Sequence, residues 1–213
     1  MNMMPFFGVC LGFQVALIEL ARNIFGWTDA NSEEFFKSPC PHHILKFMPE
    51  IDRATMGANM RLGSRPVLLQ KGSMVWQMYG AGELVYERHR HRYEFNIEHK
   101  TAFEDLGVRF SAVDDQGERM EASEFDRAKH PFFFAVQYHP EFKSRPFSPS
   151  PPFLTFMVAS TSKGEGVQPA LDRLQSEGVP SLYPLHPLLE GSVCREFLSN
   201  TKKIEKKKAW LVS

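Results

Sequence analysis

Cys10 is the residue whose type and surroundings are best suited to covalent chemistry. It follows the apolar run 6–9 and lies between Gly8 and Gly12. A strand ending at Cys10 and a helix beginning at Gly12 would place the cysteine in a strained turn that tolerates only small neighbours. Amides at the helix start would lower the thiol pKa, and the Leu11 amide would point at a developing oxyanion. The pattern predicts a nucleophile elbow, with a buried structural cysteine as the alternative.

A candidate base and its partner follow a second apolar run. Residues 132–138 are almost entirely apolar and lead into His139-Pro140-Glu141. Residues i and i+2 of an extended segment project to the same side, so Glu141 can orient the imidazole of His139. Taken alone, the pair is more typical of an ordinary strand-end histidine beside an exposed glutamate. Strand ends at one edge of a parallel sheet converge, so together with Cys10 the pair favours nucleophile, base and orienter.

The run Arg88-His89-Arg90-His91-Arg92 is the most unusual in composition. As a strand it would place its three arginines on one face and its two histidines on the other. A basic edge strand that blocks edge pairing explains this pattern. An arginine that grips a substrate carboxylate with its planar guanidinium explains it equally well. The residues alone leave both interpretations open.

Composition narrows the class of protein. The chain has 213 residues, 43% of them hydrophobic, enough for one domain with its own core and a tail. Its cysteines, at 10, 40 and 194, form no close pair and no metal-ligand spacing, so we expect a reduced, cytoplasmic protein without a metal site. Basic and acidic residues balance at 25 each, which disfavours nucleic-acid and membrane partners. No apolar run reaches membrane-spanning length, and no signal peptide is recognisable.

The elements that must position these residues can be predicted from periodicity. An apolar run without polar alternation, such as 6–9, is typical of a central strand of a parallel sheet with a neighbour on each side. We expect a helix from Gly12 closed by Gly26, loops over 29–49, and a polar tail after residue 160. Further strands are expected within 55–70 and over 108–113 and 132–138, and helices at 73–79 and 153–159. The predicted fold is α/β, a three-layer and mostly parallel sheet with flanking helices.

Six segments carry a resemblance to a known family. They are residues 5–14, 30–35, 60–63, 87–94, 117–121 and 130–141. In order and spacing they resemble the class I glutamine amidotransferase domain of the CTP synthase family. Gly-x-Cys-x-Gly with His-Pro-Glu is typical of class I glutaminases in general, whereas Arg-His-Arg-His-Arg-Tyr-Glu with Met-Arg-Leu-Gly is particular to CTP synthases. The resemblance identifies 1–160 as a partial glutaminase domain and leaves 161–213 outside as a polar, disordered tail.

The resemblance implies an activity and a set of site residues. Cys10 would attack the side-chain amide of L-glutamine, giving a glutamyl thioester and ammonia, with His139 shuttling the proton and Glu141 orienting His139. The glutamine site would be lined by Leu11, Gly12, Phe13 and Gln14, with Glu34 on the substrate amino group and Arg92 on its carboxylate. Ammonia would pass to a synthetase domain that uses ATP and Mg²⁺ to aminate UTP, in an enzyme that forms homotetramers or filaments.

The chain also departs from the family pattern. In this family the domain begins well before the cysteine, and the preceding part supplies several strands and a glycine-rich loop with a second oxyanion amide. We therefore expect the N-terminal strands to be missing and glutamine hydrolysis by the chain alone to be slow at best. No Gly-x-x-x-x-Gly-Lys-Ser/Thr loop is present, so we expect no CTP formation by this chain alone. A catalytically silent fragment or interaction module, or another class I glutaminase, is the alternative.

We predict that a glutamine-mimicking electrophile such as a diazoketone labels Cys10 before Cys40 or Cys194. Only Cys10 combines an expected helix start with a nearby candidate base. Peptide mass mapping after brief labelling measures this order. Faster labelling of Cys40 or Cys194 would contradict the elbow interpretation.

Overall fold

The helices and strands follow the hydrophobic periods of the sequence. The computed structural model describes residues 3–36, 40–51, 60–145, 148–162 and 166–177. Strands expected from apolar runs are present as β1 (Phe6–Val9), β7 (Val108–Asp114) and β9 (Phe133–Val136). The expected helices are α1 (Leu11–Asn23), α2 (Met74–Met78) and α4 (Pro151–Thr161). Helix α1 ends three residues before Gly26, which has a left-handed φ of 71°.

The main sheet is mixed rather than mostly parallel. Its strand order is β1-β9-β8-β7-β4-β5, in which β8 is Met120–Phe125, β4 is Arg61–Leu69 and β5 is Leu84–His91. Only β1 and β9 pair in parallel, and the other four pairings are antiparallel. A short turn explains the pairing of β7 with β8, because five residues join these antiparallel neighbours, whereas parallel neighbours need a long crossover. The α/β class with flanking helices is confirmed.

A small second sheet occupies a region that we expected to be loop. It pairs β2 (Asn31–Ser32) with β3 (His43–Phe47) in parallel, and β3 with β6 (Tyr93–Phe95) antiparallel. A 3₁₀ turn, η1 (Ile97–His99), and helix α3 (Lys100–Leu106) follow β6. The expected strand, turn and strand over 55–70 reduce to β4, with residues 52–59 outside the described part. Strands this short carry too little periodicity to be recognised.

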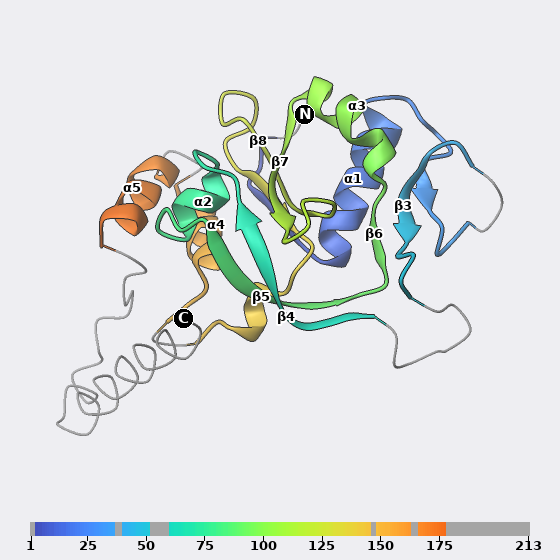
Figure 1. The fold of residues 1–213 in the computed structure, drawn as a ribbon. Helices are drawn as coiled ribbons and strands as arrows, with labels where there is room; N and C mark the ends of the chain where they lie inside the picture. Colours follow the sequence, from blue (N-terminus) through green and yellow to red (C-terminus); the bar gives the residue numbers. More distant parts are fainter. Residues whose placement is uncertain (1–2, 37–39, 52–59, 146–147, 163–165, 178–213) are drawn as a thin grey trace. The chain divides into compact units, whose positions relative to one another are not determined.

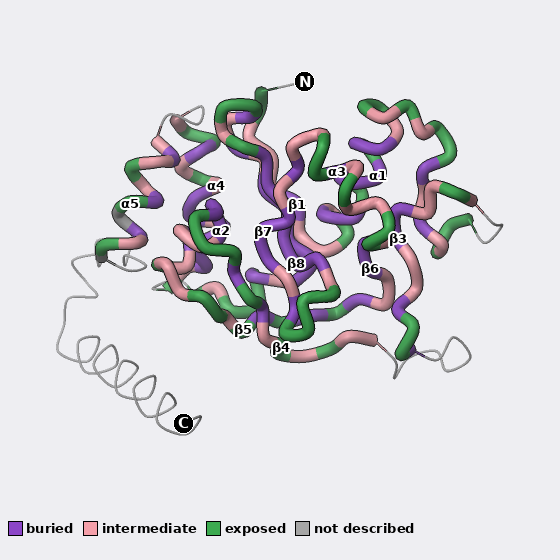
Figure 2. The backbone as a smooth tube through the Cα atoms, turned by 45° about the horizontal axis from the view of Figure 1, so that its top comes forward, coloured by how far each residue is buried: buried purple, intermediate pink, exposed green. Residues whose placement is uncertain are grey.

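Helices cover both faces of the main sheet, which gives the expected three layers. Figure 1 shows α1 and α3 on one side of the strands and α2, α4 and α5 (Val167–Glu177) on the other. One buried cluster joins α1 and α3 to the sheet through Phe13, Leu17 and Phe103. A second joins α2 and α5 to it through Met78 and Leu171. In Figure 2 the buried backbone is concentrated in the central strands.

Strand β1 lies at the edge of the sheet, where its phenylalanines pack against those of β9 and stay half-buried. Phe6 stacks on Phe133 with ring centroids 4.9 Å apart, and Phe7 stacks on Phe134 at 5.5 Å. We expected a strand with neighbours on both sides, but among the described residues β1 pairs only with β9. Cross-strand aromatic pairs of this kind add to the stability of the single β1–β9 pairing.

Helix α5 extends the folded region beyond the expected boundary at residue 160. Val167, Leu171 and Leu174 recur at helical spacing, and all three are buried. This helix packs on α2 and α4. Residues 178–213, the rest of the expected tail, lie outside the described part. Within the described ranges no helix has the length and apolarity needed to cross a membrane.

We predict that Gly8→Ala destabilises the fold by about 1–3 kcal/mol, the usual cost of overpacking. A Cβ at Gly8 would lie 2.8 Å from the backbone C and O atoms of Gly12. Gly12→Ala is the matched control: its Cβ would meet nothing within 4 Å, and alanine favours a helix by up to about 1 kcal/mol. Urea unfolding of both variants tests this, and equal stability changes would contradict it.

Candidate active site

The backbone at Cys10 forms the sharp turn expected of a nucleophile elbow. Cys10 joins β1 to α1 with φ 51° and ψ −100°, a conformation that residues other than glycine rarely adopt. Its N–H donates to the carbonyl of Val136 at 2.7 Å, which continues the β1–β9 pairing by one residue. Close packing restricts Gly8 but not Gly12, because only Gly8 faces backbone at less than 3.0 Å. The chain therefore presents Cys10 at the end of β1.

Strand β9 delivers the imidazole of His139 to the same edge. His139 follows β9 by three residues, and the 3₁₀ turn η2 (Pro140–Phe142) carries Glu141 back beside it. His139 Nδ1 lies 2.6 Å from Glu141 Oε1, and the backbone N–H of His139 donates to the carbonyl of Arg88 at 2.8 Å. Nε2 of His139 is buried and has no hydrogen-bond partner among the described residues. That nitrogen is available to exchange a proton.

Cys10 and His139 line one cavity of about 250 Å³. Its lining residues are Cys10, Gln14, Glu34, Met60, Arg90, His91, Arg92, Tyr93 and His139. The cavity thus combines a thiol, two imidazoles, a carboxylate and two guanidinium groups. This set of charges complements a small zwitterion with an amide or ester group.

The structure separates the residues predicted to line the glutamine site into two groups. Gln14, Glu34 and Arg92 line the cavity together with Cys10. The side chains of Leu11 and Phe13 do not: Leu11 is 55% exposed, and Phe13 is fully buried in the core. Gly12 lines a separate apolar hollow beside β1.

Sequence reasoning assigned no site to Met60, Arg90, His91 or Tyr93. The predicted alternation of β5 was a usable signal for Arg90, because it places Arg90 on the same face as Arg92.

The pKa of the Cys10 thiol lies above its ordinary value, opposite to the direction expected for a helix start. Burial is the largest cause and raises it, whereas the Leu11 N–H and the side chain of Gln137 lower it. Glu141 raises the pKa further, and Arg90 lowers it. At rest the Cys10 side chain is therefore a thiol rather than a thiolate. A thiol needs a base to accept its proton before it can act as a nucleophile.

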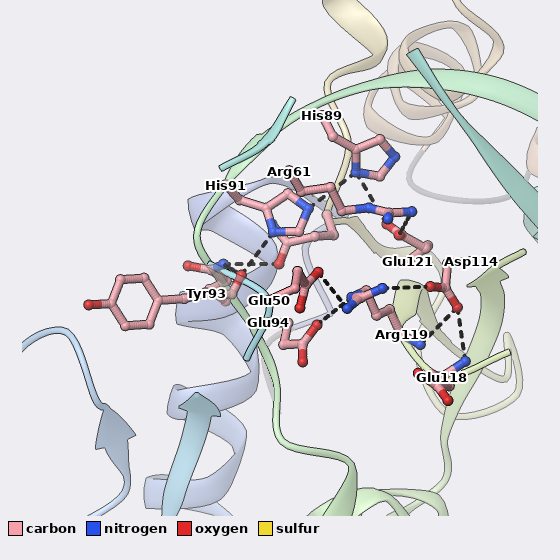
Figure 3. Close-up of polar contacts among 12 residues, drawn as sticks. Glu50, Arg61, His89, His91, Tyr93, Glu94, Asp114, Glu118, Arg119 and Glu121 are labelled. Carbon is pink, nitrogen blue, oxygen red and sulfur yellow. Dashed lines mark hydrogen bonds and ion pairs between the residues drawn. The ribbon is translucent and has the colours of Figure 1, made fainter. Parts of the chain in front are cut away.

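A buried polar cluster lies behind the cavity, where β4, β5 and β8 meet (Figure 3). Glu121 Oε1 lies 3.2 Å from Arg61 Nη2, and Glu121 Oε2 lies 3.6 Å from His89 Nδ1. His91 Nδ1 lies 2.9 Å from the Tyr93 carbonyl, which only accepts, so this nitrogen carries the proton. His91 Nε2 then accepts from His89 Nδ1 at 3.2 Å. The cluster connects the cavity wall at His91 to the centre of the sheet.

Burial keeps these groups uncharged. It raises the pKa of Glu121 to about 8, although Arg61 opposes this shift. Burial, with help from His91 and Arg61, lowers the pKa of His89 to about 2. The pKa of His91 is lowered to about 4, again chiefly by burial. At neutral pH both histidines are neutral and Glu121 is largely protonated.

Three possible metal ligands meet in this cluster, and we assign no metal to them. The ligand atoms of His89, His91 and Glu121 all lie within 4.8 Å of one another. Arg61 already contacts Glu121, the one acidic residue of the three. A divalent cation here would lie beside a guanidinium, in a site without net negative charge to attract it. His89 and His91 are hydrogen-bonded to each other and to the Tyr93 carbonyl without an ion, and Glu121 already lies against Arg61.

Arg119 forms a second ion-pair network, below the first in Figure 3. It contacts Glu50 at 2.6 Å, Glu94 at 2.7 Å and Asp114 at 3.1 Å. Glu94 belongs to β6, two residues after Arg92, and Asp114 ends β7. The Arg119 network therefore fixes the strand that follows Arg92 to the main sheet.

Comparison with known proteins agrees with this arrangement. The family described as Glutamine amidotransferase class-I matches residues 1–159. The chain is 49% identical to CTP synthase 1 of Danio rerio over 160 residues, which are 75% of this chain and 27% of that protein. It is 49% identical to CTP synthase of Archaeoglobus fulgidus over 162 residues, 75% of this chain and 29% of that protein. The chain thus spans little more than a quarter of the length of these relatives.

A solved structure shares the fold. The glutaminase domain of Trypanosoma brucei CTPS, solved with bound acivicin, aligns with a TM-score of 0.67 and 46% sequence identity. The alignment covers 74% of this chain and 60% of that one.

We predict that Glu121→Gln becomes progressively more stable than the wild type as pH rises from 5 to 8. A folded-state pKa of about 8 lies above the unfolded value, so the stability that protonated Glu121 contributes is lost as pH rises through that range. The difference in free energy of unfolding should change by up to about 1.4 kcal/mol per pH unit. Urea unfolding at three pH values measures it.

Glu118→Gln, at an exposed carboxylate in the turn before β8, is the matched control. Its free energy of unfolding should change with pH as that of the wild type does. If the stability difference between the wild type and Glu121→Gln is constant with pH, Glu121 does not hold a proton in the folded state.

Proposed function

Because the chain belongs to the class-I glutamine amidotransferase family, we propose that it is the glutaminase portion of a CTP synthase, hydrolysing L-glutamine through Cys10, His139 and Glu141. One observation carries the proposal: His139, paired with Glu141 at 2.6 Å, lines the same cavity as Cys10 at the strained end of β1. The likeness to CTP synthases over 75% of the chain supports the choice within the family.

The reaction begins with attack by Cys10 Sγ on the side-chain amide carbon of glutamine. His139 Nε2 takes the thiol proton as the C–S bond forms, and the carbonyl electron pair moves to the oxygen, which the Leu11 N–H faces. When the C–N bond breaks, His139 returns the proton to the leaving nitrogen and ammonia departs. Water, deprotonated by His139, then hydrolyses the thioester to glutamate and the free thiol. Glu141 holds Nδ1–H throughout and so keeps Nε2 facing the reaction.

The charged residues of the cavity suit the rest of the substrate. Glu34 would accept hydrogen bonds from the α-amino group, and Arg92 would hold the α-carboxylate with two parallel N–H donors. Gln14 lines the same cavity wall, and Leu11 would contribute its backbone N–H rather than its side chain. Arg90 lines the same cavity and is the alternative carboxylate ligand.

The ammonia serves a second reaction outside these residues. In the proposed enzyme a synthetase domain uses ATP and Mg²⁺ to aminate UTP to CTP, in a cytoplasmic homotetramer or filament. The match to about a quarter of the length of CTP synthases is consistent with a separate synthetase part. A catalytically silent fragment or interaction module is the competing function, and the raised pKa of the Cys10 thiol is the observation that favours it.

The test is glutamate release from glutamine by the chain, with three variants. We predict slow hydrolysis that Cys10→Ser abolishes. Arg92→Lys keeps the charge but loses the planar fork, so it should raise the KM for glutamine about tenfold or more, with kcat less affected. Arg88→Lys is the matched control: Arg88 is exposed on β5 and outside the cavity lining, and its variant should behave as the wild type.

Hydrolysis that persists in Cys10→Ser, or that is absent from a folded wild-type chain, would overturn the proposed activity in favour of the silent module. If Arg90→Lys raises the KM for glutamine more than Arg92→Lys does, Arg90 rather than Arg92 binds the substrate carboxylate.

A further inference from the structure

Gln137 is a buried polar residue at the centre of the site, to which sequence reasoning gave no role. It directly follows β9, as Cys10 directly follows β1, and the two lie side by side through the register Val9 to Val136. Its side chain is almost fully buried, with 1% of the residue exposed. Gln137 Nε2 lies 3.6 Å from Cys10 Sγ, within hydrogen-bond range for sulfur.

The hydrogen bonds around Gln137 fix which way its amide points. The carbonyl of Tyr93 can only accept, so the side-chain group of Gln14 that lies 3.0 Å from it must be the NH₂ group. That same Nε2 has a second hydrogen, which it donates to Gln137 Oε1 at 2.9 Å. With its oxygen committed to Gln14, Gln137 presents its own NH₂ group to Cys10.

We propose that Gln137 is a further catalytic residue, which donates a hydrogen bond to the sulfur of Cys10 in an orientation imposed by Gln14 and the Tyr93 carbonyl. This inference rests on the proposed glutaminase function for its catalytic meaning, but the contact itself does not depend on glutamine. Gln137 contacts the sulfur directly, whereas Gln14 acts through Gln137 and the Tyr93 carbonyl acts through Gln14.

The hydrogen bond matters most when the sulfur carries negative charge. The sulfur gains charge as His139 removes its proton, and it regains the C–S electron pair when water breaks the thioester. A neutral thioether-like sulfur accepts hydrogen bonds weakly, so the Gln137 donor favours both charged stages over the thioester between them. It acts beside the Leu11 N–H and Arg90, which also stabilise the thiolate. Gln137 thus offsets part of the rise in thiol pKa that burial causes.

The experiment measures the pH dependence of Cys10 alkylation by iodoacetamide, followed by mass mapping of the Cys10 peptide. Gln137→Met keeps the length of the side chain and removes its donor. The pKa of the thiol should rise by about one unit, with about tenfold slower alkylation at pH 7 and an unchanged plateau at high pH. The other charged or titratable groups around the sulfur stay in place: Glu34, Arg90, His91, Arg92, His139 and Glu141.

Two further variants make the result specific. Gln137→Glu keeps the acceptor for Gln14 but places a carboxylate beside the sulfur, so the pKa should rise at least as far as in Gln137→Met. If circular dichroism shows that Gln137→Met is unfolded, Gln137→Glu is used to test the proposal instead. Gln116→Glu makes the same change at an exposed glutamine in the turn before β8 and should leave the Cys10 profile unchanged.

An unchanged Cys10 profile in a folded Gln137 variant would overturn the inference, even in a chain that hydrolyses glutamine. A raised pKa in a chain without glutaminase activity would support the contact while removing the proposed function. Alkylation needs no glutamine, so the two failures are separable.

Discussion

The parallel pairing of β1 with β9 is the contact on which the site depends. Its register sets Val9 beside Val136, and the Cys10 N–H extends the pairing to the Val136 carbonyl at 2.7 Å. Parallel strands leave a sheet at the same edge, so the residues that follow them meet there. Cys10 and His139 therefore converge from distant positions in the sequence without any long loop. The strain at Cys10 is compensated by this pairing on one side and by α1 on the other.

The antiparallel half of the sheet supplies the rest of the cavity wall. The carbonyl of Arg88 accepts from the His139 backbone, so β5 lies against the base, and its next residues bring Arg90 and His91 to the cavity. Beneath them, Arg61 of β4 and Glu121 of β8 form a buried contact. Removing Glu121 would leave the Arg61 guanidinium without this partner, and a buried polar group left unpartnered typically costs about 1–3 kcal/mol, more when it is charged. The strand that carries Arg90 thus depends on a contact outside the cavity.

Local patterns revealed the elbow and the His-Pro-Glu turn, because each is encoded within a few residues. Strand β8 was not predicted, because Glu121, Ser123 and Glu124 are residue types typical of a solvent-facing segment, although all are buried. Their partners are distant in sequence: Glu124 accepts from the Met74 N–H at 2.9 Å, and Glu121 meets Arg61. The pKa direction of Cys10 was wrong for a related reason. The helix start is visible in the sequence, but burial of the thiol arises only from tertiary packing.

The alternation of β5 restricts which insertions this strand accepts. His89 and His91 face the interior and Arg88 and Arg90 face outward, in register with β4 over eight residue pairs. Inserting one residue would exchange the two faces and bury guanidinium groups where the imidazoles lie. Inserting two would restore the phase. The paired strands can therefore lengthen in steps of two residues, whereas a single extra residue would have to be absorbed in a β-bulge.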